Sequence, residues 1–175
     1  MLTPTFYTKD NLAIYTRPIT AADTPYLVDI FTHMSSESRY HRFHQTVDHL
    51  TEAHVWQEAE GIATADPATQ FGLLAFIELP HEPAQPIAGA RYVKLNEEDA
   101  EIAISVRDDY HGRGVGTQLM ALIAEEAKAQ GVKRLVADIQ NDNQAVWTIL
   151  SKLPYPIHRS PEGAESSIEI ELNNE

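Results

Sequence analysis

Three glycines at alternate positions separate a strand-like apolar run from a segment with helical spacing. They are Gly112, Gly114 and Gly116, and the run before them is AEIAISV at 100–106. A glycine-rich loop that enters a helix exposes unpaired backbone N–H groups at the positive end of the helix dipole. Glycine also lets a ligand approach the backbone closely. The pattern therefore predicts a phosphate or pyrophosphate on the amides of residues 112–117.

The spacing of this loop limits which anion it can hold. Arg113 adds a cation within the loop, and Thr117 adds a hydroxyl in the first helical turn. A turn that only joins strand to helix would need one glycine rather than three. A P-loop is excluded, because no Lys-Ser/Thr pair follows the last glycine. A dinucleotide or methyltransferase fold stays open, with Asp138 as a weak acidic candidate, but only about sixty residues follow Gly116.

The rest of the chain alternates between strand and helix patterns. Strands are expected at 13–19, 71–79, 87–95, 100–106, 133–139 and 166–172, and helices at 20–34, 51–62, 114–130 and 141–153. Residues 35–50 are expected to form a loop with a short helical piece. Three successive strands predict an antiparallel meander, and the strand–helix–strand unit after them predicts a parallel pair. We therefore expect a single α/β domain over 1–175, with a mixed, largely antiparallel central sheet flanked by helices.

Composition narrows the classes of function. A chain of 175 residues that is 43% hydrophobic can bury a sizeable core. The formal net charge of −13 argues against nucleic acid as a partner. An acidic surface is compatible with cationic acceptors such as amines, and equally with a role in solubility alone. The absence of cysteine excludes disulfides, thiolate metal sites and cysteine nucleophiles. The N-terminus does not match a secretory signal, and no apolar run reaches the roughly 18 residues of a membrane span, so we expect a cytoplasmic protein.

Three segments of the chain resemble a known family. The segment VRDDYHGRGVGTQLM resembles the acyl-CoA signature of the GNAT superfamily of N-acetyltransferases, with His111 where Gln or Arg is usual. A closer likeness is to the acetyltransferase domain of bacterial Pat-type protein-lysine acetyltransferases. It is carried by MSSESRYHRF (34–43), AEIAISVRDDYHGRGVG (100–116) and NDNQAVWTILSKL (141–153). GNAT folds also have the element order expected above.

The resemblance implies acetyl-CoA as a co-substrate. Its pyrophosphate would lie on the glycine loop, its pantetheine arm would run beside the preceding strand, and the next helix would add one contact. The donor-binding residues expected on this basis are Ile104, Ser105, Val106, His111, Gly112, Arg113, Gly114, Val115, Gly116, Thr117 and Asn143. The same resemblance places Arg39 and Tyr40 at the acceptor site. Whether His111 contacts phosphate or stacks within the loop stays open.

Acetyl transfer to an amine requires proton transfer. A lysine amine has a reference pKa near 10.4, so a group near it must accept a proton, directly or through water. The resemblance assigns this role to Glu101, which could otherwise be a surface residue or an ion-pair partner. A backbone N–H near Val106 could stabilise the tetrahedral oxyanion. Many GNAT enzymes carry a tyrosine general acid where this chain has Leu150, so water would protonate the thiolate. Because the chain has no cysteine and no clear serine triad, direct transfer in a ternary complex is expected.

Several alternatives stay open at this point. His41 and His44 have a spacing compatible with metal binding, but a polar segment lining the acceptor cleft is favoured, so no metal is expected. The acceptor could be a protein lysine or a small amine. The chain could instead be a non-catalytic acyl-CoA sensor, or a nucleotide-binding oxidoreductase or methyltransferase. The sequence is compatible with a monomer or a homodimer.

Overall fold

The structure, a computed structural model, describes residues 4–43 and 51–172. His44, one of the two candidate metal-ligating histidines, lies outside the described residues. The strands are β1 (Phe6–Tyr7), β2 (Ala13–Pro18), β3 (Gln70–Ile77), β4 (Gln85–Lys94), β5 (Asp99–Val106), β6 (Arg134–Gln140), β7 (Ile157–Glu162) and β8 (Glu165–Glu171). The α-helices are α1 (Thr24–Thr32), α2 (Ser36–Phe43), α3 (Glu52–Ala63), α4 (Val115–Ala129) and α5 (Gln144–Ser151), with short 3-10 turns η1 (Ala21–Asp23) and η3 (Asp108–Tyr110).

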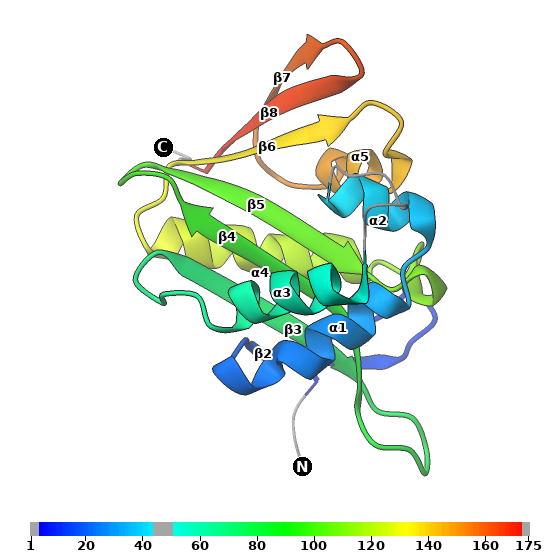
Figure 1. Cartoon of the computed structure of the whole chain (residues 1–175). Coiled ribbons are helices and arrows are strands. Elements are labelled where there is room, and N and C mark those ends of the chain that lie inside the picture. The colour runs from blue at the N-terminus through cyan, green and yellow to red at the C-terminus, as the bar shows by residue number, and fades with distance from the viewer. Residues whose placement is uncertain (1–3, 44–50, 173–175) are drawn as a thin grey trace.

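All eight of these strands belong to one sheet, in the order β1-β2-β3-β4-β5-β6-β8-β7. Every neighbouring pair is antiparallel except β5 and β6. The expected mixed, largely antiparallel sheet is therefore confirmed. Helices α1 and α3 cover one face of the sheet and α4 covers the other (Figure 1). The sequence pattern does not predict β1, because two residues are too few to show an alternation.

Each helical layer buries an apolar stripe against its face of the sheet. On α4, Leu119 and Ile123 are fully buried against β3, β4 and β5. On the opposite face, Ile30 of α1 and Ala59 of α3 are fully buried beside Leu74 of β3. Burial of such side chains contributes roughly 1.5–3 kcal/mol each relative to exposure. The two stripes fix the sheet, and with it the position of β5.

The parallel pair β5–β6 is short and opens along its length. Only three residue pairs are in register, Asp99↔Arg134, Ala100↔Leu135 and Glu101↔Val136. Beyond them the two strands diverge, and α2 and α5 lie at the open end (Figure 1). Since β4 pairs with β5 as far as Val106, residues 102–106 keep a partner on one side only. The fold therefore provides an unpaired strand edge that leads to the glycine loop.

Candidate functional site

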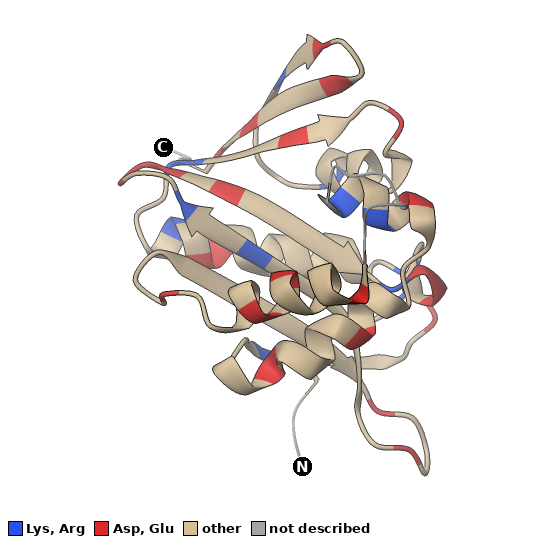
Figure 2. Cartoon of the chain, viewed as in Figure 1, with Lys and Arg blue, Asp and Glu red and all other residues tan. Residues whose placement is uncertain are grey.

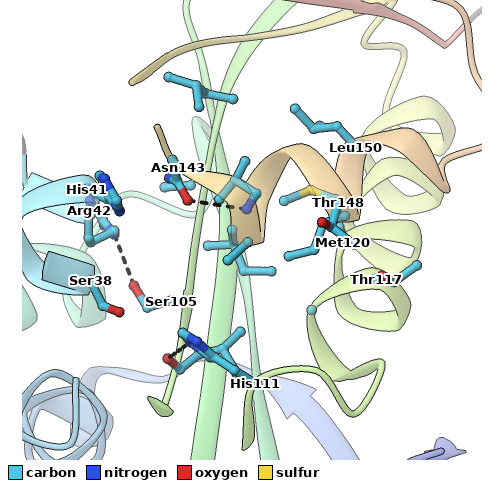
Figure 3. A pocket seen from close by; sticks show the side chains of 18 of the residues that line it. Ser38, His41, Arg42, Ser105, His111, Thr117, Met120, Asn143, Thr148 and Leu150 are labelled. Carbon is cyan, nitrogen blue, oxygen red and sulfur yellow. Dashed lines mark hydrogen bonds between the residues drawn. The ribbon is translucent and has the colours of Figure 1, made fainter. Parts of the chain in front are cut away.

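A cavity of about 700 Å³ occupies the opening between β5 and β6. Residues 101–106 of β5 form one wall, and residues of the glycine loop and the first turn of α4 form the end next to it. The opposite wall comes from α5 and the turn before it, and α2 supplies Ser38, His41 and Arg42. Figure 3 shows these side chains converging from α2, α4 and α5. The expected donor-binding residues other than Arg113 all line this one cavity, as does Glu101.

The three glycines of the loop are required for two different reasons. Gly112 and Gly114 have φ of 71° and 88°, in the left-handed region that other residues occupy only at a cost. Gly116 has ordinary helical geometry, but a Cβ there would lie 2.5 Å from Cδ1 of Ile149 on α5. The first two glycines shape the loop, and the third lets α5 pack onto the start of α4. The N–H groups of the first turn of α4 thus face the cavity end without intrahelical partners.

The backbone of β5 presents alternate residues to the cavity. The Arg107 amide donates to the Ile87 carbonyl, and the Leu95 amide donates to the Asp99 carbonyl, both on the β4 side. In an antiparallel ladder such bonding recurs at every second residue. The odd-numbered residues of β5 therefore bond to β4, and the backbone groups of Ile104 and Val106 face the opening toward β6.

His111 is held against the end of this strand. Its Nε2 lies 2.9 Å from the Val106 carbonyl oxygen, and the contact is drawn in Figure 3. The same ring nitrogen lies 3.9 Å from an Asp108 carboxylate oxygen. The imidazole ring therefore connects the glycine loop to the end of β5. His111 thus has a structural role, at a position where Gln or Arg is usual in the family.

Asn143 begins α5 and also lines the cavity. Its side-chain oxygen accepts a hydrogen bond from the Val146 amide at 3.3 Å, the usual arrangement of an N-cap. The side chain is buried, and its amide N–H₂ group keeps two donors beyond the cap. The predicted ligand contact at Asn143 is therefore compatible with its capping role.

Arg113 is placed differently from the expectation. Its guanidinium bonds to Asp10 at 3.1 Å and lies over the Tyr110 ring at 5.0 Å, and its side chain does not line the cavity. Two lysines that the sequence pattern did not single out, Lys9 and Lys152, line the cavity instead. Lys9 comes from the turn after β1, and Lys152 follows α5.

Arg39 and Tyr40, which were expected at the acceptor site, lie outside the lining of the cavity. Arg39 donates to the Phe31 carbonyl at 2.8 Å, Tyr40 is exposed, and neither lines the cavity. Residues 36–43 form the short helical piece expected within residues 35–50, so only one face of this segment turns toward the site. Ser38, His41 and Arg42 share that face because they are three and four residues apart.

Charged residues gather around Glu101 on the α3 side of the sheet. Arg42 donates from Nε to the Ser105 hydroxyl at 3.1 Å. Burial and, next, the neighbouring Arg91 lower the pKa of Arg42 to about 10, while Glu58 and Glu101 oppose this. The pKa of Arg91 is likewise lowered by burial, against the same two carboxylates. Figure 2 shows this grouping, with basic bands on α2 and β4 and acidic bands on α3 and β5.

His41 reaches from α2 across the cavity to the turn before α5. Its Nε2 lies 3.0 Å from Oδ1 of Asp142, in the turn before α5, and its side chain is only 11% exposed. Among residues 4–43 and 51–172 no group of three or more His, Asp or Glu residues is placed to hold a metal ion. Within the same residues, no helix is long and apolar enough to cross a bilayer.

Comparison with known proteins identifies the family. The profile of the Acetyltransferase (GNAT) domain matches residues 14–155. The chain belongs to the GNAT acetyltransferase family. The GNAT domain of S. lividans PAT has a similar structure, with a TM-score of 0.79 and 26% identity over 95% of this chain and 94% of that one. This bears out the GNAT family, its fold, and the Pat-type likeness.

Two other GNAT proteins frame the comparison. Acetyltransferase Pat of Mycolicibacterium smegmatis is 33% identical over 141 residues, which cover 79% of this chain. The match spans 40% of that relative, so the chain corresponds to less than half of its length. The PaiA N-acetyltransferase of Thermoplasma acidophilum, solved in complex with coenzyme A, has a TM-score of 0.67 at 13% identity, over 91% of this chain and 99% of that one.

Leu150 is the position at which the family resemblance implies a tyrosine general acid in many GNAT enzymes. It is 3% exposed and lines the cavity. A leucine side chain has no titratable proton, so this position cannot supply a general acid.

Proposed function

We propose that this GNAT protein transfers the acetyl group of acetyl-CoA to a primary amine, namely the side chain of a protein lysine. One observation carries the proposal: the loop with exposed helix N-terminal amides leads directly onto an unpaired strand edge within one cavity. Phosphate on the amides and a linear arm along the strand match the shape of acyl-CoA. The coenzyme A complex of the Thermoplasma relative and the Pat relative support the donor and the acceptor, respectively.

The chemistry proposed at the site begins with the amine. Glu101 accepts the proton that the amine loses, directly or through water, and the nitrogen attacks the thioester carbonyl. The C–N bond forms and the C–S bond breaks, and the CoA thiolate takes a proton from solvent. Arg42 and Arg91 lie close enough to Glu101 for their charges to interact with its carboxylate.

The position of the oxyanion donor follows from distance along β5. At about 3.3 Å per residue, Val106 lies roughly 16 Å from Glu101, too far for one thioester to reach both. Ile104 lies roughly 10 Å from Glu101, and its backbone also faces the opening. We therefore assign the oxyanion donor to the N–H of Ile104 rather than Val106.

The experiment is a thiol-release assay with acetyl-CoA against amines, lysine peptides and whole acyl-CoA synthetases. Replacement of the base in Glu101→Gln is expected to lower kcat by about 10²–10⁴-fold while acetyl-CoA still binds. Glu97→Gln, an exposed residue of the β4–β5 turn, is the matched control with unchanged activity. Full turnover in E101Q would remove Glu101 from the mechanism. Binding without any turnover in the wild type would favour an acyl-CoA sensor.

Calorimetry separates the proposal from the nucleotide-binding alternatives. Acetyl-CoA is expected to give a binding heat, whereas NAD and S-adenosylmethionine are expected to give none. The absence of heat with acetyl-CoA would contradict the proposal at its first step.

A further inference from the structure

Two lysines from opposite ends of the chain are fixed beside the glycine loop. The Lys9 amide donates to the Arg113 carbonyl at 2.9 Å. Cγ and Cε of Lys9 lie 3.6 and 3.7 Å from where a Cβ on Gly114 would be. The Lys9 side chain therefore runs across this glycine. Lys152 directly follows α5, the helix whose Ile149 packs onto Gly116. Lys9 thus lies against Gly114, Lys152 follows the helix that packs on Gly116, and both lysines line the cavity.

The two side chains meet each other rather than a carboxylate. Repulsion by Lys9 is the largest cause of a lowered pKa at Lys152, and a side-chain contact with Lys9 is the next. In the described part of the chain, neither lysine is within ion-pair distance of an acidic group, whereas the nearby Arg113 is paired with Asp10. The sequence has 26 acidic and 13 basic residues, so most basic side chains could find a carboxylate nearby. Two lysines that are close in space and have no carboxylate partner among the described residues are therefore unexpected for this composition. Two neighbouring ammonium groups on the wall of a cavity suit an anionic ligand.

We propose that Lys9 and Lys152 form a phosphate-binding site, next to the loop amides, that recognises the nucleotide end of acyl-CoA. The inference rests on the proposed function and extends it to donor selectivity. The amides of the first turn of α4 can hold one phosphate group, and the lysine pair holds a further one. An ammonium group suits this role, because it is a compact charge with three donors on a flexible stem.

Two phosphate groups of the donor could occupy the pair. One is the ribose 3′-phosphate, a monoester that carries close to two negative charges at pH 7. The other is the pyrophosphate, shared between the amides and the lysines. In both cases the site favours free acyl-CoA over an acyl-pantetheine that has no nucleotide.

The test is calorimetry with acetyl-CoA on the whole chain and on K9Q, K152Q and the double variant. Each single substitution is expected to weaken binding about fivefold and the double substitution about twentyfold. Lys128→Gln, in the last turn of α4 and far from the loop, is the matched control with unchanged affinity. Lys9→Arg/Lys152→Arg retains both charges and should retain most of the affinity. Because all three lysines are exposed, these variants should fold normally.

A second titration with 3′-dephospho-acetyl-CoA identifies the phosphate. If the pair holds the 3′-phosphate, this ligand binds the wild type more weakly, and the lysine substitutions cause no further loss. If the pair holds the pyrophosphate, the substitutions weaken both ligands equally. Affinity of the double variant within twofold of wild type for acetyl-CoA overturns the inference and leaves the proposed function intact. A wild type that does not bind acetyl-CoA overturns both.

Discussion

The two ends of the cavity recognise their ligands by different physical means. The donor end is built mainly from one continuous segment, residues 104–117, which offers backbone amides whose geometry depends on glycine, and Asn143 and the two lysines add side chains to it. The acceptor end is assembled from α2, α3, β4 and β5, and it offers charged side chains around Glu101. Backbone recognition requires a particular loop shape, whereas side-chain recognition requires distant segments to be brought together. Substitutions at the two ends should therefore affect different ligands.

Apart from replacement of the proposed base Glu101, the largest effect is expected from a glycine at the donor end. Gly112→Ala and Gly131→Ala both place a side chain at positive φ, 71° and 85°, with nothing within 4 Å of the new Cβ. Each should cost about 1–2 kcal/mol of stability, measured by urea unfolding. Only Gly112 lines the cavity, so only G112A should weaken acetyl-CoA binding, by about 10- to 100-fold, with the acceptor KM unchanged. Equal loss of acetyl-CoA affinity in both variants would show that strain, rather than loop geometry, is responsible.

A smaller effect is expected at the acceptor end, where a substitution should impair use of the acceptor and leave acetyl-CoA binding nearly unchanged. Arg42→Met removes a mostly buried charge that bonds Ser105 and attracts Glu101, with a stability loss of about 2 kcal/mol. Acetyl-CoA affinity should stay within twofold of wild type, while kcat/KM for the acceptor falls about tenfold. Arg39→Met, on the same helix, removes one bond to a backbone carbonyl and should cost about 1 kcal/mol. If R39M lowers kcat/KM for the acceptor more than R42M does, the acceptor contact is made by Arg39, as the sequence predicts, and not by Arg42.

The contrast between the ends also explains how far sequence reasoning reached. Local patterns in the sequence predicted the loop glycines, the end of the strand at 104–106 and Asn143 as donor-binding residues. The structure brings all of them into one cavity. A short helical piece was expected within residues 35–50, but its bounds were not, because its polar residues show no apolar stripe. The face of α2 that lines the cavity was therefore not predictable. Ser38, His41 and Arg42 follow once the helix is known.

The lysine pair could not be predicted for a different reason. Lys9 and Lys152 are separated by most of the chain, and each is an ordinary exposed residue in its own segment. Arg113 seemed the better cation because it stands inside the loop, but Asp10 comes close enough in space to pair with it. A pattern along the chain cannot show which cation has a carboxylate beside it in the folded protein.

The smallest expected effect is a transfer of protons at the donor end. In the free protein, repulsion by Lys9 lowers the pKa of Lys152, and a bound phosphate would raise this pKa again. At alkaline pH, between the lower and the higher pKa, binding of acetyl-CoA should therefore take up a fraction of a proton, and affinity should fall as pH rises through that window. The measurement is the binding heat in buffers of different ionisation enthalpy. The buffer dependence should shrink in K9Q and K152Q but persist in K128Q and R42M. A dependence that persists undiminished in K9Q and K152Q would place the titrating group outside the lysine pair, whereas its loss in R42M would place that group at the acceptor end.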